Sequence, residues 1–428
     1  MPIKPSHILG MNGRYRYTKL NPSSARAFGF SKLKTKQLLL ENNIPTAQLY
    51  HMFESYTDLD HVIWENIPCP FVQKPASGSA GKGIRIITKY LPQRSIWQDN
   101  ENEEVTVEDL NLHVQNILDG EYSTWGSSHR ALVEEMIIAH PVLKKLSKGG
   151  TPDIRIIVFN SVPIMAMARI PTEESGGKAN LDIGAIGLGI DMSSGLTTFG
   201  IQGKSKYIKR FPQQKRKVSG IQIPFWRETL LMAVSAAQAA GFIFMGADLF
   251  IDETKGPMVV ELNGFPGLSI QLANKAGLKR RIERVEGIEV RNADHGVRIA
   301  QALFAKFYVD QQRVEQGLTI ISNKPTIVVK GDRTKDLEVP ALVNTLRARS
   351  AISRKLAVDL GLLDYDDLLW QQQEVSEGKV PVVEVEFEVK DQLVKTAMLA
   401  VQRLDKSKYK VELGQHDIKQ FLIGDIET

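Results

Sequence analysis

The sequence predicts an α+β fold in two parts: a larger part that mixes helices with strands, and a smaller part made mostly of strands. Between residues 31 and 317, runs of good helix formers alternate with runs of β-branched and aromatic residues. From Ile327 onward the apolar runs are short and β-like, and one short helical run interrupts them. We therefore expect a first domain at 1–310, a linker at 311–325 and a mostly β domain at 326–428.

Composition limits the class of protein. The chain has 428 residues, of which 43% are hydrophobic and 24% charged, as in ordinary globular proteins. The formal net charge of +5 is mild; it suits small anionic ligands and is weak evidence for nucleic acid. The single cysteine, Cys69, excludes an internal disulfide framework, and no apolar run is long enough to span a membrane. We therefore expect a cytoplasmic protein without a membrane span.

The elements of the larger part are expected in a definite order. A helix begins after Ser31, whose hydroxyl suits an N-cap, and ends before Pro45. The acidic segment WQDNENEEVTVEDLNLHVQNILDG is expected to be a solvated loop that leads into a helix. A later helix, FWRETLLMAVSAAQAAGF, stops near Gly241, and another is expected at GVRIAQALFAKFYVDQQRVEQG. Two pairs of strands are separated by turns at 160–161 and 255–256. The expected strands are FVQKP, IRIIT, RALVEEMII, DIRIIVF, VPIMAMARI, FMGADLFID and PMVVELN.

A glycine-rich stretch, FVQKPASGSAGKGIRII at 71–87, indicates phosphate binding. It is not a Walker loop, because Lys82 is followed by glycine, and it is not a dinucleotide fingerprint, because it leads into a strand. A glycine hairpin remains, which can fold over a triphosphate while Lys74 neutralises charge. The alternative is a flexible hairpin with solvated lysines. The candidate nucleotide-binding residues here are Lys74, Ser77, Gly78, Ser79, Gly81, Lys82 and Gly83.

Three oxygen-bearing residues near the end of the larger part suit a metal ion. Asp248 lies on one expected strand, and Glu261 and Asn263 lie two apart on the next, so the latter two face the same side. Mg²⁺ prefers such oxygen ligands and completes its shell with phosphates and water. Glu261 lies in an apolar run, where a cation would offset the cost of burying a carboxylate. The alternative is a structural Glu261 paired with an arginine.

Charged residues also lie between these two features. Glu134 and Glu135 end a strand, where a carboxylate can accept hydrogen bonds from an adenine amino group or ribose hydroxyls. Asp153 and Arg155 alternate on one face of the next strand, and Arg169 could reach a transferring phosphoryl group. Each of them alone is also consistent with an ordinary surface salt bridge.

The order of these features resembles that of the ATP-grasp ligases, and among them the RimK-type alpha-L-glutamate ligases and their relatives. The resemblance implies two α/β subdomains that grip ATP. It spans about residues 8–305 and rests on Lys32 in SKLKTK, Lys74 with its glycine loop, VEEMI, DIR, Arg169, Asn180, Asp248 and VELNGFPGLS.

The resemblance also implies a role for each matching residue. ATP would be held by Lys32 and Lys74 at the phosphates and by Glu134, Glu135 and Ile137 at adenine and ribose, and Asp153 is counted with this group. Two Mg²⁺ ions, with Mn²⁺ as an alternative, would be held by Asp248, Glu261 and Asn263. The residues expected to face the acyl phosphate and the substrate are Arg155, Arg169 and Asn180.

The implied reaction is ligation of a carboxylate to an amine. The carboxylate attacks the γ-phosphate of ATP, and an amine then displaces phosphate from the acyl phosphate. The small-molecule substrate is expected to be an amino acid, with glutamate among the candidates, or a peptide. Two alternatives stay open: phosphoryl transfer to a hydroxyl without amide formation, and a scaffold that binds nucleotide without chemistry.

The chain departs from the RimK-type pattern in three places. The segment before Lys32, residues 1–30, is much shorter, so the identity of the substrate does not carry over. The RimK-type SNxxRGG stretch appears as ANLDIGA, without its arginine. A basic segment at 204–217 either binds an acidic substrate or a protein partner, or is a solvated loop.

The smaller part, about residues 325–426, resembles the retropepsin-like fold and the RimK-associated zinc protease family. VPALVNTLRARSAISRKLAVDLGLL and VELGQHDIKQFLIGD carry this resemblance. Asn344 stands where those proteases have the catalytic aspartate, and Leu346 where they have glycine. An aspartic protease needs two carboxylates that share a proton, so we expect a domain without proteolytic activity that binds peptide or forms a homodimer. The alternative is an unrelated small β domain.

Overall fold

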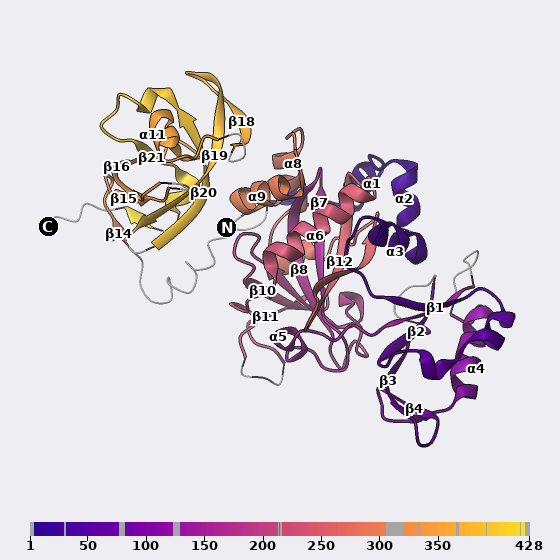
Figure 1. Ribbon diagram of the computed structural model, residues 1–428. Coiled ribbons are helices and arrows are strands. Elements are labelled where there is room, and N and C mark those ends of the chain that lie inside the picture. The colour runs from indigo at the N-terminus through magenta and orange to yellow at the C-terminus, as the bar shows by residue number, and fades with distance from the viewer. Residues whose placement is uncertain are drawn as a thin grey trace. The chain divides into compact units, whose positions relative to one another are not determined.

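The computed structural model describes residues 4–29, 31–76, 82–122, 129–212, 214, 216–304, 320–331, 334–364, 368–390, 392–419 and 421–423 (Figure 1). The chain forms two compact units. The first comprises Met1–Ile190 and Thr197–Arg284, and the second comprises Asp191–Leu196 and Val285–Thr428. Within the described ranges, no helix combines the length and the apolar composition needed to cross a membrane.

The first unit begins with short helices that lead into a longer one. They are η1 (Pro5–His7), α1 (Met11–Thr18), α2 (Ser23–Phe28) and α3 (Lys32–Glu41). The expected N-cap is present, because the Ser31 hydroxyl accepts a hydrogen bond from Lys34 N at 3.3 Å. Asn21 ties this segment to the core, since its side chain bonds the backbone of Ile243 and Phe244.

One sheet of the first unit has six antiparallel strands in the order β1-β6-β2-β3-β4-β5. The strands are β1 (Leu49–Phe53), β2 (Phe71–Pro75), β3 (Arg85–Leu91), β4 (Ile96–Asp99), β5 (Glu104–Val105) and β6 (Ala131–Glu135). The strands on either side of the glycine loop therefore pair as the sequence predicts. Successive side chains of a strand alternate in direction, so Glu134 and Glu135 point to opposite faces.

The apolar core of this sheet lies on one face. Helix α4 (Val107–Leu118) packs against β2 and β6, and its first turn is held by a capping box between Thr106 and Asp109. The short helices η2 (Tyr56–His61) and η3 (Trp64–Asn66) lie beside it, and the rings of Phe53, Trp64 and Phe71 stack with centroids 5.8 and 6.0 Å apart. Burying each such ring contributes roughly 2–3 kcal/mol. The opposite face carries Lys74 and Glu134, which are thus kept away from the core.

The other sheet of the first unit has seven antiparallel strands in the order β11-β10-β9-β8-β7-β12-β13. The strands are β7 (Asp153–Phe159), β8 (Val162–Ile170), β9 (Ile186–Ile190), β10 (Thr197–Gln202), β11 (Lys206–Ile208), β12 (Phe244–Asp252) and β13 (Gly256–Asn263). Both expected turns are present: Asn160 and Ser161 have φ of 51° and 58°, and Gly256 has φ of 75°.

Helices occur before, between and after the strands of this sheet along the chain. They are α5 (Pro141–Lys144), η4 (Leu181–Ile183), α6 (Trp226–Ala239), α7 (Ile270–Asn274) and α8 (Leu278–Val285). Helix α6, the helix expected before Gly241, packs against β7, β8, β12 and β13, whereas α7 packs against β8, β9 and β10. The sheet allows α7 to come close because Gly189 has no side chain there.

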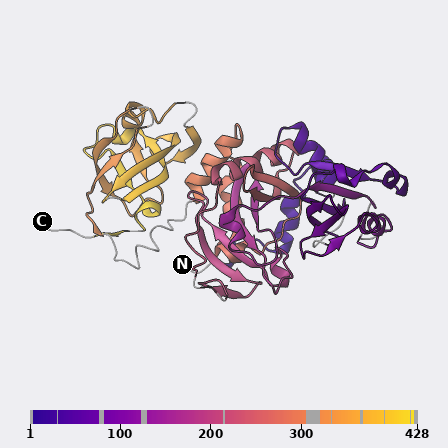
Figure 2. The same ribbon diagram turned by 60° about the horizontal axis from the view of Figure 1, so that its bottom comes forward.

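In the second unit, six strands close into a barrel in the order β15-β16-β21-β17-β20-β19, since β15 also pairs with β19. Strand β18 extends the sheet beside β19, and β14 pairs with β22. Figure 2 shows these strands in orange to yellow. They are β14 (Ile320–Ile321), β15 (Thr326–Val329), β16 (Leu337–Val343), β17 (Ala351–Ser353), β18 (Leu368–Glu374), β19 (Gly378–Val389), β20 (Gln392–Val401), β21 (Val411–Leu413) and β22 (Leu422–Ile423).

The helices of the second unit are α9 (Ala293–Phe304), α11 (Arg354–Asp359), η5 (Gln402–Leu404) and α12 (Gln415–Ile418). Helix α9 corresponds to the helix expected at GVRIAQALFAKFYVDQQRVEQG, and it belongs to this unit by its contacts. Its His295 Nε2 lies 2.8 Å from Leu369 O, and Arg291 donates to Leu368 O at 3.0 Å. Residues 305–319 lie outside the described ranges, so the linker at 311–325 stays a prediction.

Gly189→Ala is expected to destabilise the first unit. The added methyl carbon would lie 2.4 Å from Ala273 O and 2.9 Å from Asn274 Cα, which are backbone atoms of α7. Relief requires the helix to shift, at a cost of about 2–4 kcal/mol. Thermal unfolding of the full chain should show a midpoint lower by several degrees.

Gly10→Ala is the matched control, because a methyl carbon at Gly10 meets nothing within 4 Å. Equal midpoints for Gly189→Ala and Gly10→Ala would contradict the close packing of α7 on β9.

Candidate active site

Strand register brings the charged residues of the seven-stranded sheet onto one face. Asp248 of β12 lies opposite Arg155 of β7 on one side and opposite Glu261 of β13 on the other. Asp153 lies opposite Arg169 in the β7–β8 pair. Directly opposed residues of antiparallel strands share a face, so these five side chains form one row, which we call the charged row.

The arginines and aspartates of the charged row are directly bonded. Arg155 donates to both carboxylate oxygens of Asp248, at 2.7 and 2.6 Å. Arg169 donates to both oxygens of Asp153, at 2.6 and 2.5 Å, and also to Asp248 at 2.7 Å. Asp153 and Asp248 are 6% and 5% exposed, so these are buried ion pairs in which each carboxylate needs its arginine.

The two aspartates of the row respond differently to this environment. Burial alone would raise the pKa of Asp248, but the charges of Arg155 and Arg169 outweigh it and lower that pKa to about 2. Burial raises the pKa of Asp153 to about 6, because Arg169 offsets it only in part and the negative charge of Asp248 adds to it. The pKa of Arg169 is raised: burial lowers it, and both aspartates more than compensate.

Glu261 is the member of the row that suits a cation. Within the described part of the chain, no hydrogen bond or ion pair holds its carboxylate. Burial, followed by the negative charge of Asp248, raises its pKa, although Lys32 and the two arginines act in the opposite direction. A mostly desolvated carboxylate beside a second carboxylate gains from a divalent ion. The donor set is therefore consistent with Mg²⁺ at Glu261.

The other two expected metal ligands are already engaged. Asn263 Oδ1 accepts from Phe265 N at 2.8 Å, and Asp248 is bonded to both arginines. No cluster of three or more histidines, cysteines, aspartates or glutamates suited to a metal occurs among the described residues. A metal ion here would be coordinated mainly by Glu261. Asp248 could coordinate it only while also bonded to Arg155 and Arg169.

A second charged group, the lysine pair, lies on the six-stranded sheet and α3. Lys74 Nζ lies 2.7 Å from Glu134 Oε2, and Lys36 Nζ lies 3.3 Å from the same oxygen. Lys36 also donates to Ala47 O. Burial tends to raise the pKa of Glu134, but the charges of Lys74 and Lys36 lower it overall. Glu134 Oε1 is buried without a hydrogen-bond partner in the described structure, so one strong acceptor remains.

Lys36 is not among the site residues predicted from the sequence, although its spacing from Lys32 is a signal for it. It follows Lys32 by four residues, which puts both on one face of α3. Burial lowers the pKa of Lys32, as does the like charge of Lys74, while Glu261 and Glu134 raise it. The charge of Lys32 therefore interacts both with Glu261 of the charged row and with Lys74 and Glu134 of the lysine pair. Lys32 thus couples the two charged groups electrostatically.

Only the end of the glycine loop is described. Gly83 has φ of 68°, its carbonyl oxygen lies 3.1 Å from His113 Nε2, and a methyl carbon there would lie 2.5 Å from the Tyr122 ring. Lys82 beside it is exposed. The predicted nucleotide-binding residues Ser77, Gly78, Ser79 and Gly81 lie outside the described ranges.

The remaining predicted site residues lie apart from the charged row. Glu135 pairs with Lys255, and Ile137 packs with Ala47 and Met258 in a small apolar cluster. Asn180 caps η4 by accepting from Asp182 N at 3.0 Å. The described contacts bring none of these three to Arg155 or Arg169.

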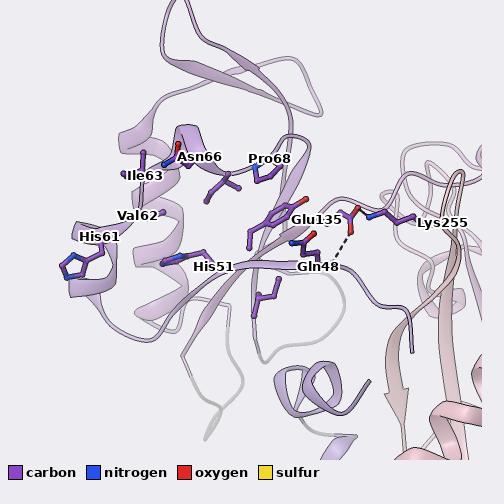
Figure 3. Close-up of a pocket in the computed structure, with 12 residues that line it drawn as sticks. Gln48, His51, His61, Val62, Ile63, Asn66, Pro68, Glu135 and Lys255 are labelled. Carbon is purple, nitrogen blue, oxygen red and sulfur yellow. Dashed lines mark hydrogen bonds and ion pairs between the residues drawn. The ribbon is translucent and has the colours of Figure 1, made fainter. Parts of the chain in front are cut away.

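A cavity of about 680 Å³ lies on the Glu135 face of β6, away from Glu134. Figure 3 shows Glu135 and Lys255 at one end of it and His61 at the other. The residues that line it are Gln48, Leu49, Tyr50, His51, His61, Val62, Ile63, Asn66, Ile67, Pro68, Glu135 and Lys255. Since neither the charged row nor the lysine pair contributes to it, we assign it no part in the chemistry.

Comparison with known proteins identifies one family. The family model described as "Sugar-transfer associated ATP-grasp" matches residues 11–287, which is more than half of the chain. No curated protein matches the sequence.

Solved structures resemble the chain only distantly. D-alanine–D-alanine ligase from Bacillus anthracis is 12% identical over 72% of this chain and 78% of its own, with a TM-score of 0.33. D-cycloserine synthetase DcsG is 12% identical over 64% of this chain and 76% of its own, with a TM-score of 0.37. N5-carboxyaminoimidazole ribonucleotide synthetase, in its ADP complex, is 11% identical over 58% and 48%, with a TM-score of 0.36. Scores this low support no argument about the site.

Asp153→Asn is expected to change how stability depends on pH. The pKa of Asp153 rises from 3.8 to about 6 on folding, so the folded state binds more protons between these values. Asp153 therefore lowers the free energy of unfolding as pH rises from about 4 to about 6. In Asp153→Asn that decrease should be smaller than in the wild type, as measured by urea unfolding at a series of pH values.

Asp60→Asn, at an exposed aspartate, is the control for this measurement. If Asp153→Asn and Asp60→Asn have parallel pH profiles between pH 4 and 6, Asp153 does not titrate as described.

Proposed function

The chain belongs to the sugar-transfer associated ATP-grasp family, and from this premise we propose that it is an ATP- and Mg²⁺-dependent carboxylate–amine ligase. The observation that carries the proposal is the charged row, in which two arginines and three carboxylates lie together on one sheet face. Fixed charges of both signs suit a reaction in which negative charge moves from a carboxylate to a phosphoryl group and then to phosphate.

The proposed reaction has two steps. An oxygen of the substrate carboxylate forms a bond to the γ-phosphorus of ATP while the bond to the β–γ bridging oxygen breaks, and ADP leaves. The amine nitrogen then bonds to the carbonyl carbon, phosphate leaves with its bonding electron pair, and the nitrogen loses a proton. The products are an amide or peptide, ADP and phosphate.

The lysines are proposed to hold the phosphates. Lys74 and Lys32 supply positive charge, and Glu134 sets the position of Lys74 through their ion pair at 2.7 Å. Lys36 shares the same carboxylate oxygen and keeps Glu134 ionised. We thus assign Oε2 of Glu134 to the lysines, because it accepts from both of them, and the predicted contact of Glu134 with adenine or ribose stays a proposal for its open Oε1. The predicted nucleotide contacts of Glu135 and Ile137 stay proposals.

The arginines are proposed to face the transferring phosphoryl group. Arg155 and Arg169 are both bonded to Asp248, and Arg169 also to Asp153, so their guanidinium groups are held in place before substrate binds. A donor that needs no reorientation stabilises developing charge at lower cost. Asn180, in contrast, has no described contact to them, and its role rests on the family resemblance alone.

Glu261 is proposed as the main ligand of Mg²⁺, with Asn263 and Asp248 beside it on the same face. Bound there, the ion would neutralise charge on the phosphate oxygens. The resemblance to RimK-type enzymes favours an amino acid, with glutamate among the candidates, or a peptide as substrate. The description of the matched family, associated with sugar transfer, leaves the acceptor open.

The test is product analysis. The full chain is incubated with Mg²⁺-ATP and a matrix of amino acids and small carboxylic acids, phosphate release is measured, and products are identified by mass spectrometry. We expect phosphate and ADP together with an amide that joins one acid and one amine. A phosphorylated product that contains no amine would identify a phosphotransferase instead.

Glu261→Gln tests the metal assignment. The loss of the free carboxylate should reduce ATP turnover about 100-fold and raise the Mg²⁺ concentration needed for half-maximal turnover. Glu253→Gln, at an exposed glutamate after β12, is the matched control. ATP turnover in Glu261→Gln equal to that in Glu253→Gln would rule out Glu261 as a ligand.

For the second unit we propose a retropepsin-like module without proteolytic activity. The closed barrel and the meeting of its two signature segments support this, since Ser350 Oγ accepts from Gly414 N at 2.9 Å and bonds Asp417. Asn344 accepts from Leu346 N at 3.1 Å and supplies no carboxylate. We propose that the second unit binds peptide or forms a homodimer.

The full chain is expected to leave a library of unstructured peptides uncut. Peptide cleavage that disappears in Asn344→Ala would contradict this proposal. Light scattering of the eluting protein with and without peptide distinguishes homodimer formation from peptide binding.

A further inference from the structure

The N-terminal helix α1 carries a buried cation without an acid partner. Arg14 is 8% exposed, and it donates to Pro266 O at 3.1 Å and to Met11 Sδ at 3.2 Å. Its Nε is buried and has no hydrogen-bond partner. No carboxylate of the described residues pairs with it, whereas Arg155 and Arg169 have aspartates.

Arg14 contacts the loop that follows the last strand of the charged row. Its guanidinium carbon is 3.7 Å from the centroid of the Phe265 ring. The loop between β13 and α7 contains Phe265, Pro266 and Gly267, and Gly267 lies close to Arg155, since a methyl carbon there would be 3.8 Å from Arg155 Nη1. The loop therefore contacts Arg14 at Phe265 and Pro266 and comes close to Arg155 at Gly267. Phe265 is 44% exposed, so solvent reaches this region.

The position of Arg14 is held by other contacts of the N-terminal segment. Leu9 N donates to Gln271 Oε1 at 2.9 Å, and Gln271 Nε2 donates to Leu9 O at 3.1 Å. Asn21 bonds the start of β12. The segment is thus fixed at two places around Arg14, which holds the guanidinium where it is before a ligand arrives.

A buried guanidinium without a counter-charge is unfavourable, and stacking on an aromatic ring offsets only part of that cost. Burial lowers the pKa of Arg14, as expected for a cation that lacks a partner. Nη1 and Nη2 each donate one hydrogen bond, and each has one further N–H for an anion, whereas Nε is enclosed. A guanidinium suits the planar fork of a carboxylate or phosphate.

We propose that Arg14 binds a second anionic group of the substrate, a carboxylate or a phosphate, at a distance from the carboxylate that reacts at the charged row. This rests on the proposed ligase function. The RimK-type SNxxRGG stretch has an arginine that ANLDIGA lacks. In this chain, Arg14 of α1 would supply the positive charge for an acidic substrate instead. The chain thereby selects a substrate that carries a second negative charge.

The test compares three probes that share one carboxylate: succinate, 3-phosphonopropionate and succinamate, which has a neutral amide at its far end. Binding to the full chain is measured by titration calorimetry with and without Mg²⁺-ADP. Wild-type protein should bind at least one dianion more tightly than succinamate, and the tighter dianion identifies carboxylate or phosphate chemistry.

Arg14→Met keeps much of the apolar contact with Phe265 and removes the charge. It should weaken binding of the preferred dianion at least about tenfold, leave succinamate unchanged, and leave the unliganded unfolding midpoint equal or higher. Arg16→Met, at an exposed arginine of the same helix, should behave like the wild type.

Three results would overturn the inference: no preference of the wild type for a dianion, the same preference in Arg14→Met, or a lower midpoint in Arg14→Met with unchanged binding, which indicates a purely structural arginine. Failure of the ligase proposal would be seen separately: the wild-type protein would then not bind Mg²⁺-ADP or would form no amide.

Discussion

Charges buried on the face of the seven-stranded sheet can stay there only because they compensate one another, and the candidate site depends on this constraint. Asp248 is stable as a carboxylate because two arginines hold it, and each arginine is in turn kept in one orientation. Glu261 stands beside this pair without a bonded partner among the described residues. The unbalanced member of the row therefore marks where a cation is most favourable.

The same constraint explains the lysine pair on the other sheet. A nearly fully buried glutamate is tolerated because two ammonium groups meet one of its oxygens. Lys32 is coupled electrostatically to this group and to Glu261, and burial makes its charge costly as well. A polyanion such as a nucleoside triphosphate would neutralise the excess positive charge around these lysines, so the electrostatics of this group favour such a ligand.

The elements and their faces could be predicted from the sequence because they depend on local periodicity. The cap at Ser31, the hairpin across the glycine loop and the shared face of Glu261 and Asn263 follow from spacing alone. Lys36 could also have been predicted, because it follows Lys32 by four residues on the same helix. The assignment of helix α9 to the barrel unit could not be predicted, because its partners Leu368 and Leu369 lie more than seventy residues further along the chain.

Which residues are charged, which face of each strand they occupy and which ligand chemistry they suit can all be inferred from the amino-acid sequence. Which charged residues form ion pairs and hydrogen bonds with each other depends on the tertiary fold. Arg155 and Asp248 are 93 residues apart, and Arg14 and Pro266 are 252 apart, so their contacts depend on which strands become neighbours. Whether a buried charge is satisfied or left open is a property of that neighbourhood, because the energy of an ion pair depends on distance and burial rather than on position along the chain.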